Sequence, residues 1–188
     1  MTQSVSTALL IGVSDYSAYD RSVGNAVGTS NLFSIHNNLR MSWDMVRALG
    51  FNPSDIALLS SPLAPLIDAH PGIYGEATRQ MVLDAVAALA RKLASCDVAR
   101  GTIHFSGHGG SVSGVGPVIA VSDTVVEDGQ LTNYVALSEI VEILVKNAPG
   151  KPVTMLLDSC GSGLFPRIPG KPRMGCLLYT SPSPRDNR

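Results

Sequence analysis

This sequence of 188 residues lacks any strong excess of charge and any long hydrophobic run. Its 14 Lys and Arg residues nearly balance its 15 Asp and Glu residues and form no basic block, which argues against a nucleic-acid-binding protein. Apolar runs such as Ala8–Val13 are about six residues long, whereas a helix that crosses a membrane needs about 20. No Lys or Arg precedes that run, so a secretory signal is not expected. These absences predict a soluble cytoplasmic protein with neither nucleic acid nor membrane among its partners.

Cysteine is also scarce. The chain contains Cys96, Cys160 and Cys176, which form neither a metal-ligand pair nor a disulfide framework. A zinc site is therefore not expected.

Hydrophobic residues make up 45% and charged residues 15% of the chain, a composition that excludes an intrinsically disordered protein. The length fits one domain.

The end of the chain differs in character from the rest. Residues 176–188 resemble the translation of a transposase sequencing adapter, in which the codons TGT CTC TTA TAC ACA TCT encode Cys-Leu-Leu-Tyr-Thr-Ser. Composition alone would also permit a genuine tail rich in Pro and Ser. We therefore divide the chain into a natural domain over residues 1–175 and a non-native, adapter-derived tail over residues 176–188. Under this division Cys176 has no functional meaning.

The body of the chain alternates short apolar segments with amphipathic ones. Five segments have the composition of strands: Ala8–Val13, Ile56–Leu59, Thr102–Phe105, Pro117–Val121 and Val153–Leu157. Apolar residues recur at helical spacing in a helix that stops at Gly50, in another that Thr78 caps, and in a third that begins at Ser138. A loop rich in Ser, Gly and Asn is expected from Ser14 to about Asn31. This alternation predicts an α/β domain with a mainly parallel sheet.

Two of the predicted strands run into glycine-rich segments that carry reactive side chains. The segment after Phe105 contains His108, and the segment after Leu157 contains Cys160. Because catalytic groups collect at the carboxyl ends of parallel strands, the two side chains would emerge side by side if the strands are neighbours. Alone, such a cysteine is usually a small core residue and such a histidine a polar loop residue. The two occupy equivalent glycine-flanked positions 52 residues apart, a spacing typical of a caspase-type histidine and nucleophile.

Three segments together resemble the caspase-like cysteine peptidases of family C14. They are Ala8-Leu-Leu-Ile-Gly-Val, Phe105-Ser-Gly-His-Gly and Leu157-Asp-Ser-Cys-Gly-Ser-Gly. They are most similar to the metacaspase-type branch, whose hallmark segments read Ser-Gly-His-Gly and Asp-Ser-Cys-His-Ser-Gly. The resemblance covers about residues 8–163 in family order. It implies a caspase-like (caspase-hemoglobinase) fold, a mainly parallel sheet flanked by helices. One departure is Gly161, where metacaspases usually carry histidine.

The resemblance implies a cysteine-type endopeptidase that hydrolyses peptide bonds in protein or peptide substrates. Cys160 would attack the scissile carbonyl as a thiolate and form a thioester acyl-enzyme. His108 would protonate the departing amine and then activate water. The backbone N–H groups of Cys160 and Gly109 would form the oxyanion hole.

Substrate preference rests on an acid two residues before the nucleophile. Asp158 corresponds to an acid that lines the metacaspase pocket for a basic P1 side chain, although a loop-capping role is the alternative. A second acid of that pocket is expected in a Cys-x-Asn-Asp segment, but this chain reads Ile35-His-Asn-Asn38. Asn38 therefore puts the Arg/Lys preference of the family in doubt.

The expected reaction requires no cofactor. A dependence on Ca²⁺ is kept as an alternative, because some metacaspases require calcium. Asp123, Glu127 and Asp128 supply oxygen donors within one loop, although three acids in a loop are more often simply solvated.

Other classes of function fit less well. A serine hydrolase could use His108-Gly-Gly in its oxyanion hole, but no Gly-x-Ser-x-Gly elbow follows. A nucleotide-binding domain would show Gly-x-Gly-x-x-Gly after the first strand, and this chain does not. A non-catalytic caspase-like interaction module is the remaining alternative, although both members of the Cys-His pair are present.

The family resemblance also predicts that the small-subunit portion is missing. Residues 164–175 contain Pro166, Pro169 and Pro172, which cannot form an interior strand. The strand Val153–Leu157 would then be an exposed apolar edge, and substrate would be positioned poorly. We expect the chain as given to be poorly soluble and to have little or no peptidase activity.

Overall fold

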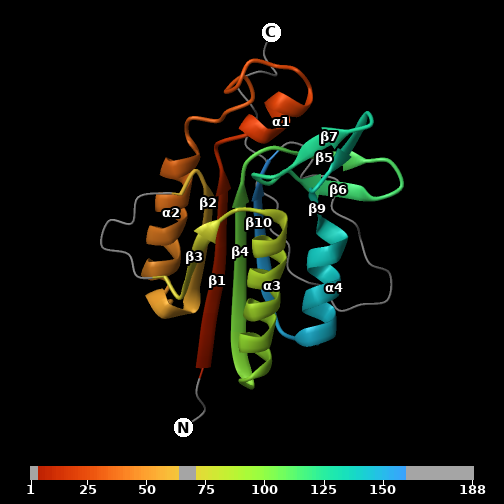
Figure 1. The fold of residues 1–188 in the computed structure, drawn as a ribbon. Coiled ribbons are helices and arrows are strands. Elements are labelled where there is room, and N and C mark those ends of the chain that lie inside the picture. The colour runs from red at the N-terminus through yellow and green to blue at the C-terminus, as the bar shows by residue number, and fades with distance from the viewer. Residues whose placement is uncertain (1–3, 64–70, 160–188) are drawn as a thin grey trace.

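A five-stranded parallel sheet forms the centre of the molecule (Figure 1). The computed structural model describes residues 4–63 and 71–159. The strands are β1 (Ser4–Val13), β2 (Ile56–Ser61), β3 (Ile73–Glu76), β4 (Val98–Ser106) and β10 (Val153–Asp158). They pair in the order β10-β4-β1-β2-β3, and every pairing is parallel. The predicted α/β class with a mainly parallel sheet is confirmed.

Helices cover both faces of this sheet (Figure 1). The helix α2 (Ile35–Ala48) packs on one face, while α3 (Arg79–Ala94) and α4 (Leu137–Asn147) pack on the other. Along β1, Leu10 lies in the core on the α2 face, whereas its neighbours Leu9 and Ile11 lie in the larger core on the α3 face. Successive strand residues point to opposite faces, and here both faces are covered. This explains why the strand segments read as continuous apolar runs.

The helix boundaries follow from local chemistry. The Thr78 hydroxyl accepts a hydrogen bond from the Met81 N–H at 3.3 Å and caps α3, as the sequence predicted. After α2, Gly50 has a φ of +86°, a conformation that glycine adopts without steric cost. The helix α4 begins at Leu137, one residue before the predicted start, and the Glu139 carboxylate accepts the Ala136 N–H at 2.9 Å.

Short elements occupy the loops at both edges of the sheet. The expected loop after β1 contains the helix α1 (Ser17–Ser22), and the 3₁₀ helix η1 (Pro53–Asp55) precedes β2. Two small antiparallel sheets follow β4. One consists of β5 (Gly109–Val112), β6 (Gly116–Ile119) and β9 (Val135–Ala136), and the other of β7 (Val125–Glu127) and β8 (Gln130–Thr132). The first strand of the sheet β5-β6-β9 begins at Gly109, directly after His108.

The strand β10 is the last strand of the central sheet within residues 4–63 and 71–159. Val153, Met155 and Leu157 are buried, and the alternate side chains are half-buried. The predictions for residues 160–175 and for the tail over residues 176–188 lie outside the described residues. None of the described helices is long and apolar enough to cross a membrane.

Candidate active site

The two predicted catalytic segments start at the same edge of the sheet. Strands β4 and β10 are parallel neighbours, and Ser106 pairs with Asp158 at their carboxyl ends. The Gly107 N–H donates to the Asp158 carbonyl at 3.2 Å, which ties the two segments together beyond the strands. The two strands are therefore neighbours, which is the condition under which the two segments were expected to lie side by side. Cys160, the predicted nucleophile and oxyanion donor, lies outside the described residues, two positions after Asp158.

His108 is half-buried and is held by two segments from the N-terminal part of the chain. Its backbone N–H donates to the Tyr16 hydroxyl at 2.6 Å, and its ring lies 4.6 Å from the Tyr16 ring. Its Nε2 lies 2.8 Å from the Ser30 carbonyl oxygen. A carbonyl oxygen can only accept, so Nε2 carries a proton. In the neutral imidazole, Nδ1 is then the unprotonated nitrogen that can act as a base.

Tyr16 is a close neighbour of His108 that the sequence analysis missed. The residue is 2% exposed, and burial raises the pKa of its phenol well above the ordinary value. The phenol therefore keeps its proton, which it donates to the Ala120 carbonyl at 3.4 Å. A Cβ atom on Gly107 would lie 2.6 Å from the Tyr16 hydroxyl, so this glycine is required for the contact. The glycine before His108 was the signal that could have pointed to a close neighbour.

Asp158 lies in a small polar cluster with Asn38 and Ser106. The Asn38 amide donates to the Asp158 Oδ2 and to the Ser106 hydroxyl, both at 3.0 Å. The Ser106 hydroxyl donates in turn to Oδ2 at 2.9 Å. The structure thus brings together the two residues that the sequence analysis assigned to the P1 pocket and adds Ser106. Both bonds to the carboxylate end on Oδ2, which leaves Oδ1 for other partners.

A buried histidine lies behind this cluster. His104 of β4 is 8% exposed, and its Nδ1 lies 3.0 Å from the Ser42 hydroxyl, which also contacts the Asn38 carbonyl at 2.8 Å. Desolvation lowers the pKa of His104, and the negative charge of Asp158 partly opposes this effect. His104 is therefore a neutral, structural side chain that supports Asn38 through Ser42.

Gly109, the predicted second oxyanion donor, is the first residue of β5. It pairs with Ile119 of β6, and the next residue, Ala120, donates its N–H to the His108 carbonyl at 2.9 Å. The β5-β6 hairpin therefore fixes the backbone on both sides of His108.

The three acids considered for Ca²⁺ belong to two different local structures. The Asp123 carboxylate accepts the Arg79 N–H at 2.8 Å at the start of α3. Glu127 and Asp128 belong to the β7–β8 hairpin, whose turn has Asp128 and Gly129 at positive φ. Within the described part of the chain, no group of three or more His, Cys, Asp or Glu side chains could hold a metal ion.

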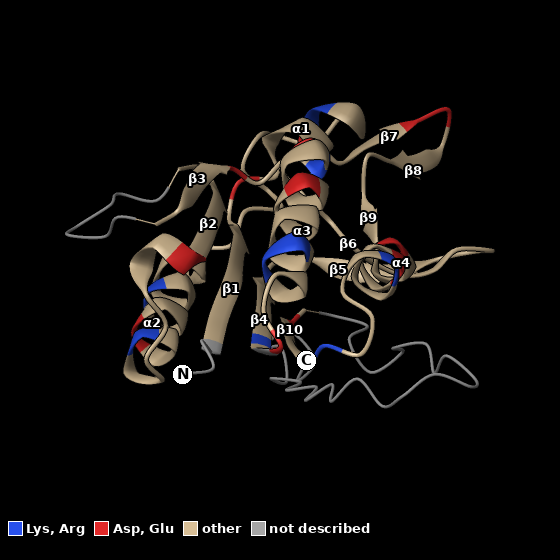
Figure 2. Ribbon diagram, turned by 90° about the horizontal axis from the view of Figure 1, so that it is seen from below, with Lys and Arg blue, Asp and Glu red and all other residues tan. Residues whose placement is uncertain are grey.

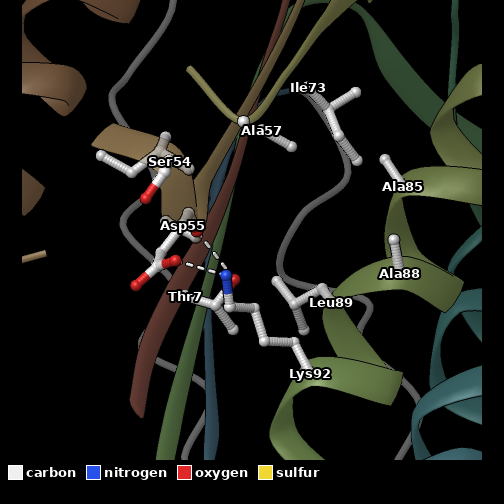
Figure 3. A pocket seen from close by; sticks show the side chains of 12 residues that line it. Thr7, Ser54, Asp55, Ala57, Ile73, Ala85, Ala88, Leu89 and Lys92 are labelled. Carbon is white, nitrogen blue, oxygen red and sulfur yellow. Dashed lines mark hydrogen bonds and ion pairs between the residues drawn. The ribbon is translucent and has the colours of Figure 1, made fainter. Parts of the chain in front are cut away.

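A cavity of about 190 Å³ lies at the opposite end of the strands, between β1, β2, β3 and α3 (Figure 3). Its two charged side chains, Asp55 and Lys92, form an ion pair with each other. The remaining lining is mostly small or apolar. This cavity is separate from the His108 segment.

Figure 2 shows Lys and Arg interspersed with Asp and Glu along α2 and α3, with no stripe of one sign.

Comparisons with known proteins agree with this geometry. The model of the family described as Caspase domain, peptidase C14, matches residues 5–181. No curated protein sequence matches the chain. The crystal structure of protein GSU0716 from Geobacter sulfurreducens is similar with a TM-score of 0.56 at 20% identity, over 83% of this chain and 50% of that one.

A second similar structure is that of pro-sf-caspase-1. It aligns with a TM-score of 0.53 at 11% identity, over 98% of this chain and 64% of that one. The chain thus spans half to slightly under two thirds of these two structures. At such identities the likeness concerns the fold, whereas the family model covers nearly the whole sequence. The chain belongs to the caspase domain family.

Proposed function

We propose that this protein is a cysteine endopeptidase of the metacaspase type, with Cys160 as nucleophile and His108 as general acid and base. Membership of the caspase domain family supports a peptidase-like function. The observation that carries the finer proposal is the hydrogen bond from His108 Nε2 to the Ser30 carbonyl at 2.8 Å. It fixes a tautomer with a basic Nδ1 at the sheet edge from which the chain continues to Cys160.

The proposed reaction has two stages. In the first, the Cys160 thiolate forms a bond to the scissile carbonyl carbon, and the backbone N–H groups of Cys160 and Gly109 stabilise the oxyanion. Protonated His108 gives its proton to the departing amine as the C–N bond breaks, which leaves a thioester. In the second, His108 takes a proton from water, and the resulting hydroxide displaces the thiol and releases the new carboxylate.

For specificity, we propose that Asp158 binds Arg or Lys at P1. The Asp158 carboxylate accepts hydrogen bonds from Asn38 and Ser106 at Oδ2 and keeps a second oxygen, and a carboxylate is suited to bind a guanidinium or ammonium group. Asn38 adds no second negative charge. The preference for basic over neutral P1 residues should therefore be smaller than in a pocket with two acids.

The proposed hydrolysis uses protein side chains and water and requires no cofactor. We also propose that Ca²⁺ regulates the peptidase. Peptidase assays with and without a chelator test this dependence. We also propose a cytoplasmic location, with protein or peptide substrates as the partners.

The test replaces Cys160 and, as a control, Cys96 in the protein expressed from its complete reading frame. Cys160→Ala should abolish both peptidase activity and labelling by a peptide-based alkylating agent. Cys96→Ala is the matched control, since Cys96 is half-buried between α3 and β4, and this variant should keep both. Undiminished labelling of Cys160→Ala would refute the assignment. A labelled wild type that cleaves no peptide would favour a non-catalytic module.

A further inference from the structure

The loop that holds His108 has little regular structure of its own. Residues 23–34 connect α1 with α2, and the Ser30 carbonyl that accepts the His108 Nε2–H lies in this loop. A general base loses efficiency when its contacts shift by even about 1 Å. Some feature outside the His108 segment must therefore fix the Ser30 carbonyl.

The strongest anchor of this loop is the carboxylate of Asp20 in α1. Its Oδ1 accepts the Ser30 hydroxyl at 2.7 Å, and its Oδ2 accepts the N–H groups of Ser30 at 3.2 Å and of Gly28 at 2.9 Å. Ser30 is thus bound through its main chain and its side chain to one carboxylate. The Asp20 carbonyl also accepts the Asn25 N–H at 2.9 Å.

The neighbouring residue fixes the other side of the Ser30 carbonyl. The Asn31 N–H donates to the Gly28 carbonyl at 3.2 Å, and the Asn31 side-chain oxygen accepts the Tyr16 N–H at 2.9 Å. The peptide groups before and after Ser30 are therefore both held. Tyr16 links them to His108 a second time through its hydroxyl.

Asp20 has the properties that such an anchor requires. Its side chain is fully buried, and the hydrogen bond from the Ser30 hydroxyl is the main cause that lowers its pKa below the ordinary value. A carboxylate removed from solvent is tolerated when hydrogen bonds replace its water, as the three donors do here. Asp20 is therefore ionised throughout the pH range in which a histidine acts as acid or base.

We propose that Asp20 is a positioning residue for His108, because its carboxylate holds Ser30 so that the Ser30 carbonyl keeps the proton on Nε2 and leaves Nδ1 basic. This inference rests on the proposed peptidase function for its effect on rate. The orientation and tautomer of His108 are physical properties that exist whether or not the protein cleaves peptides.

Asp20→Asn tests the proposal with little change in shape. The new amide places an N–H₂ group against the donors of Ser30 and Gly28, so part of the hydrogen bonding to Ser30 and Gly28 is lost. The neutral His108 ring, observed through its ¹⁵N chemical shifts, should change from the Nε2–H form to a mixture of both tautomers. With an Arg-containing peptide, kcat should fall about 10²-fold while KM changes little.

Two further variants separate positioning from general stability. Ser30→Ala removes one of the three bonds to Asp20 and keeps the carbonyl, so it should shift the tautomer in the same direction by a smaller amount. Asp123→Asn removes a carboxylate that accepts a backbone N–H at α3, and it should leave the His108 tautomer as in wild type.

The outcomes are distinct. A folded Asp20→Asn variant with the wild-type tautomer and kcat would overturn the proposal. If that variant does not fold, an unchanged tautomer in Ser30→Ala would overturn it. If the tautomer changes in Asp20→Asn but no substrate analogue labels the protein, the positioning role is upheld. That result would count against the peptidase function alone.

Discussion

The two ends of the central sheet hold their polar groups in different ways. At the carboxyl end, His108 and Asp158 are bound by side chains and carbonyls from distant segments, including Tyr16, Ser30 and Asn38. At the amino end, the side chains of Asp55 and Lys92 form an ion pair beside a cavity lined by both polar and apolar residues. A group that must act on a ligand has to be oriented by others, whereas an ion pair of this kind satisfies itself. Substitutions at the two ends should therefore have very different effects on activity.

Of the four substitutions that compare the two ends of the sheet, Asp158→Asn is expected to have the largest effect. Asp158→Asn removes the charge proposed to bind a basic P1 side chain, and a hydrogen bond to a charged group contributes about 1.5–3 kcal/mol. The kcat/KM for peptides with Arg or Lys at P1 should fall about 10- to 150-fold. Peptides with Gln or Asp at P1 serve as controls, and an equal fall for all of them would refute the role in specificity.

Tyr16→Phe should have the next largest effect. It keeps the ring beside His108 but leaves the His108 N–H without its acceptor, which costs about 1–3 kcal/mol for a buried group. Urea unfolding should show this loss, and kcat should fall as well. Tyr19→Phe is the matched control in α1, since Tyr19 is only partly buried against the core. Equal stability of the two variants would contradict the account.

A smaller effect concerns pH and the buried His104. Because its pKa is lowered in the folded protein, the unfolded chain binds a proton that the folded chain does not, between this lowered value and about 6.5. Stability should therefore decrease as the pH falls through this window. His104→Asn should flatten that dependence in unfolding experiments at pH 7.5 and 5.5. An unchanged slope would show that other groups cause it.

The smallest effect is expected at the amino end. The side chains of Lys92 and Asp55 are 38% and 20% exposed, and ion pairs in such settings contribute about 0–1 kcal/mol. Lys92→Met keeps the apolar part of the side chain and should leave kcat/KM unchanged. A fall in activity comparable to that of Asp158→Asn would remove the distinction between the two ends.

The sheet was predictable from the sequence because local pattern determines it. Strands covered on both faces read as apolar runs, and Gly50 and Thr78 mark helix ends through their own backbone and hydroxyl chemistry. The strand β6 overlaps the predicted segment Pro117–Val121. The strands β3, β5, β7, β8 and β9 were missed because strands of two to four residues leave almost no periodic signal.

The candidate site was only partly predictable. His108 and Asp158 stand in recognisable glycine-flanked motifs, and Asn38 was singled out through the family pattern. Tyr16 and Ser30 reach His108 across 92 and 78 residues of sequence, and no local pattern encodes such contacts. Asp20 acts one step further away, through Ser30. Residues that position a catalytic group through hydrogen bonds to the backbone become visible only in the folded chain.

The most direct test of the central claim is the pH dependence of Cys160 alkylation by iodoacetamide, in wild type and in His108→Ala. An ordinary thiol has a pKa of about 8.5 and reacts slowly at pH 6. If His108 lies beside Cys160 with Nδ1 available, wild type should be alkylated at pH 6 at least about tenfold faster than the variant, and the two rates should converge above about pH 9. Identical profiles for the two proteins would contradict the account.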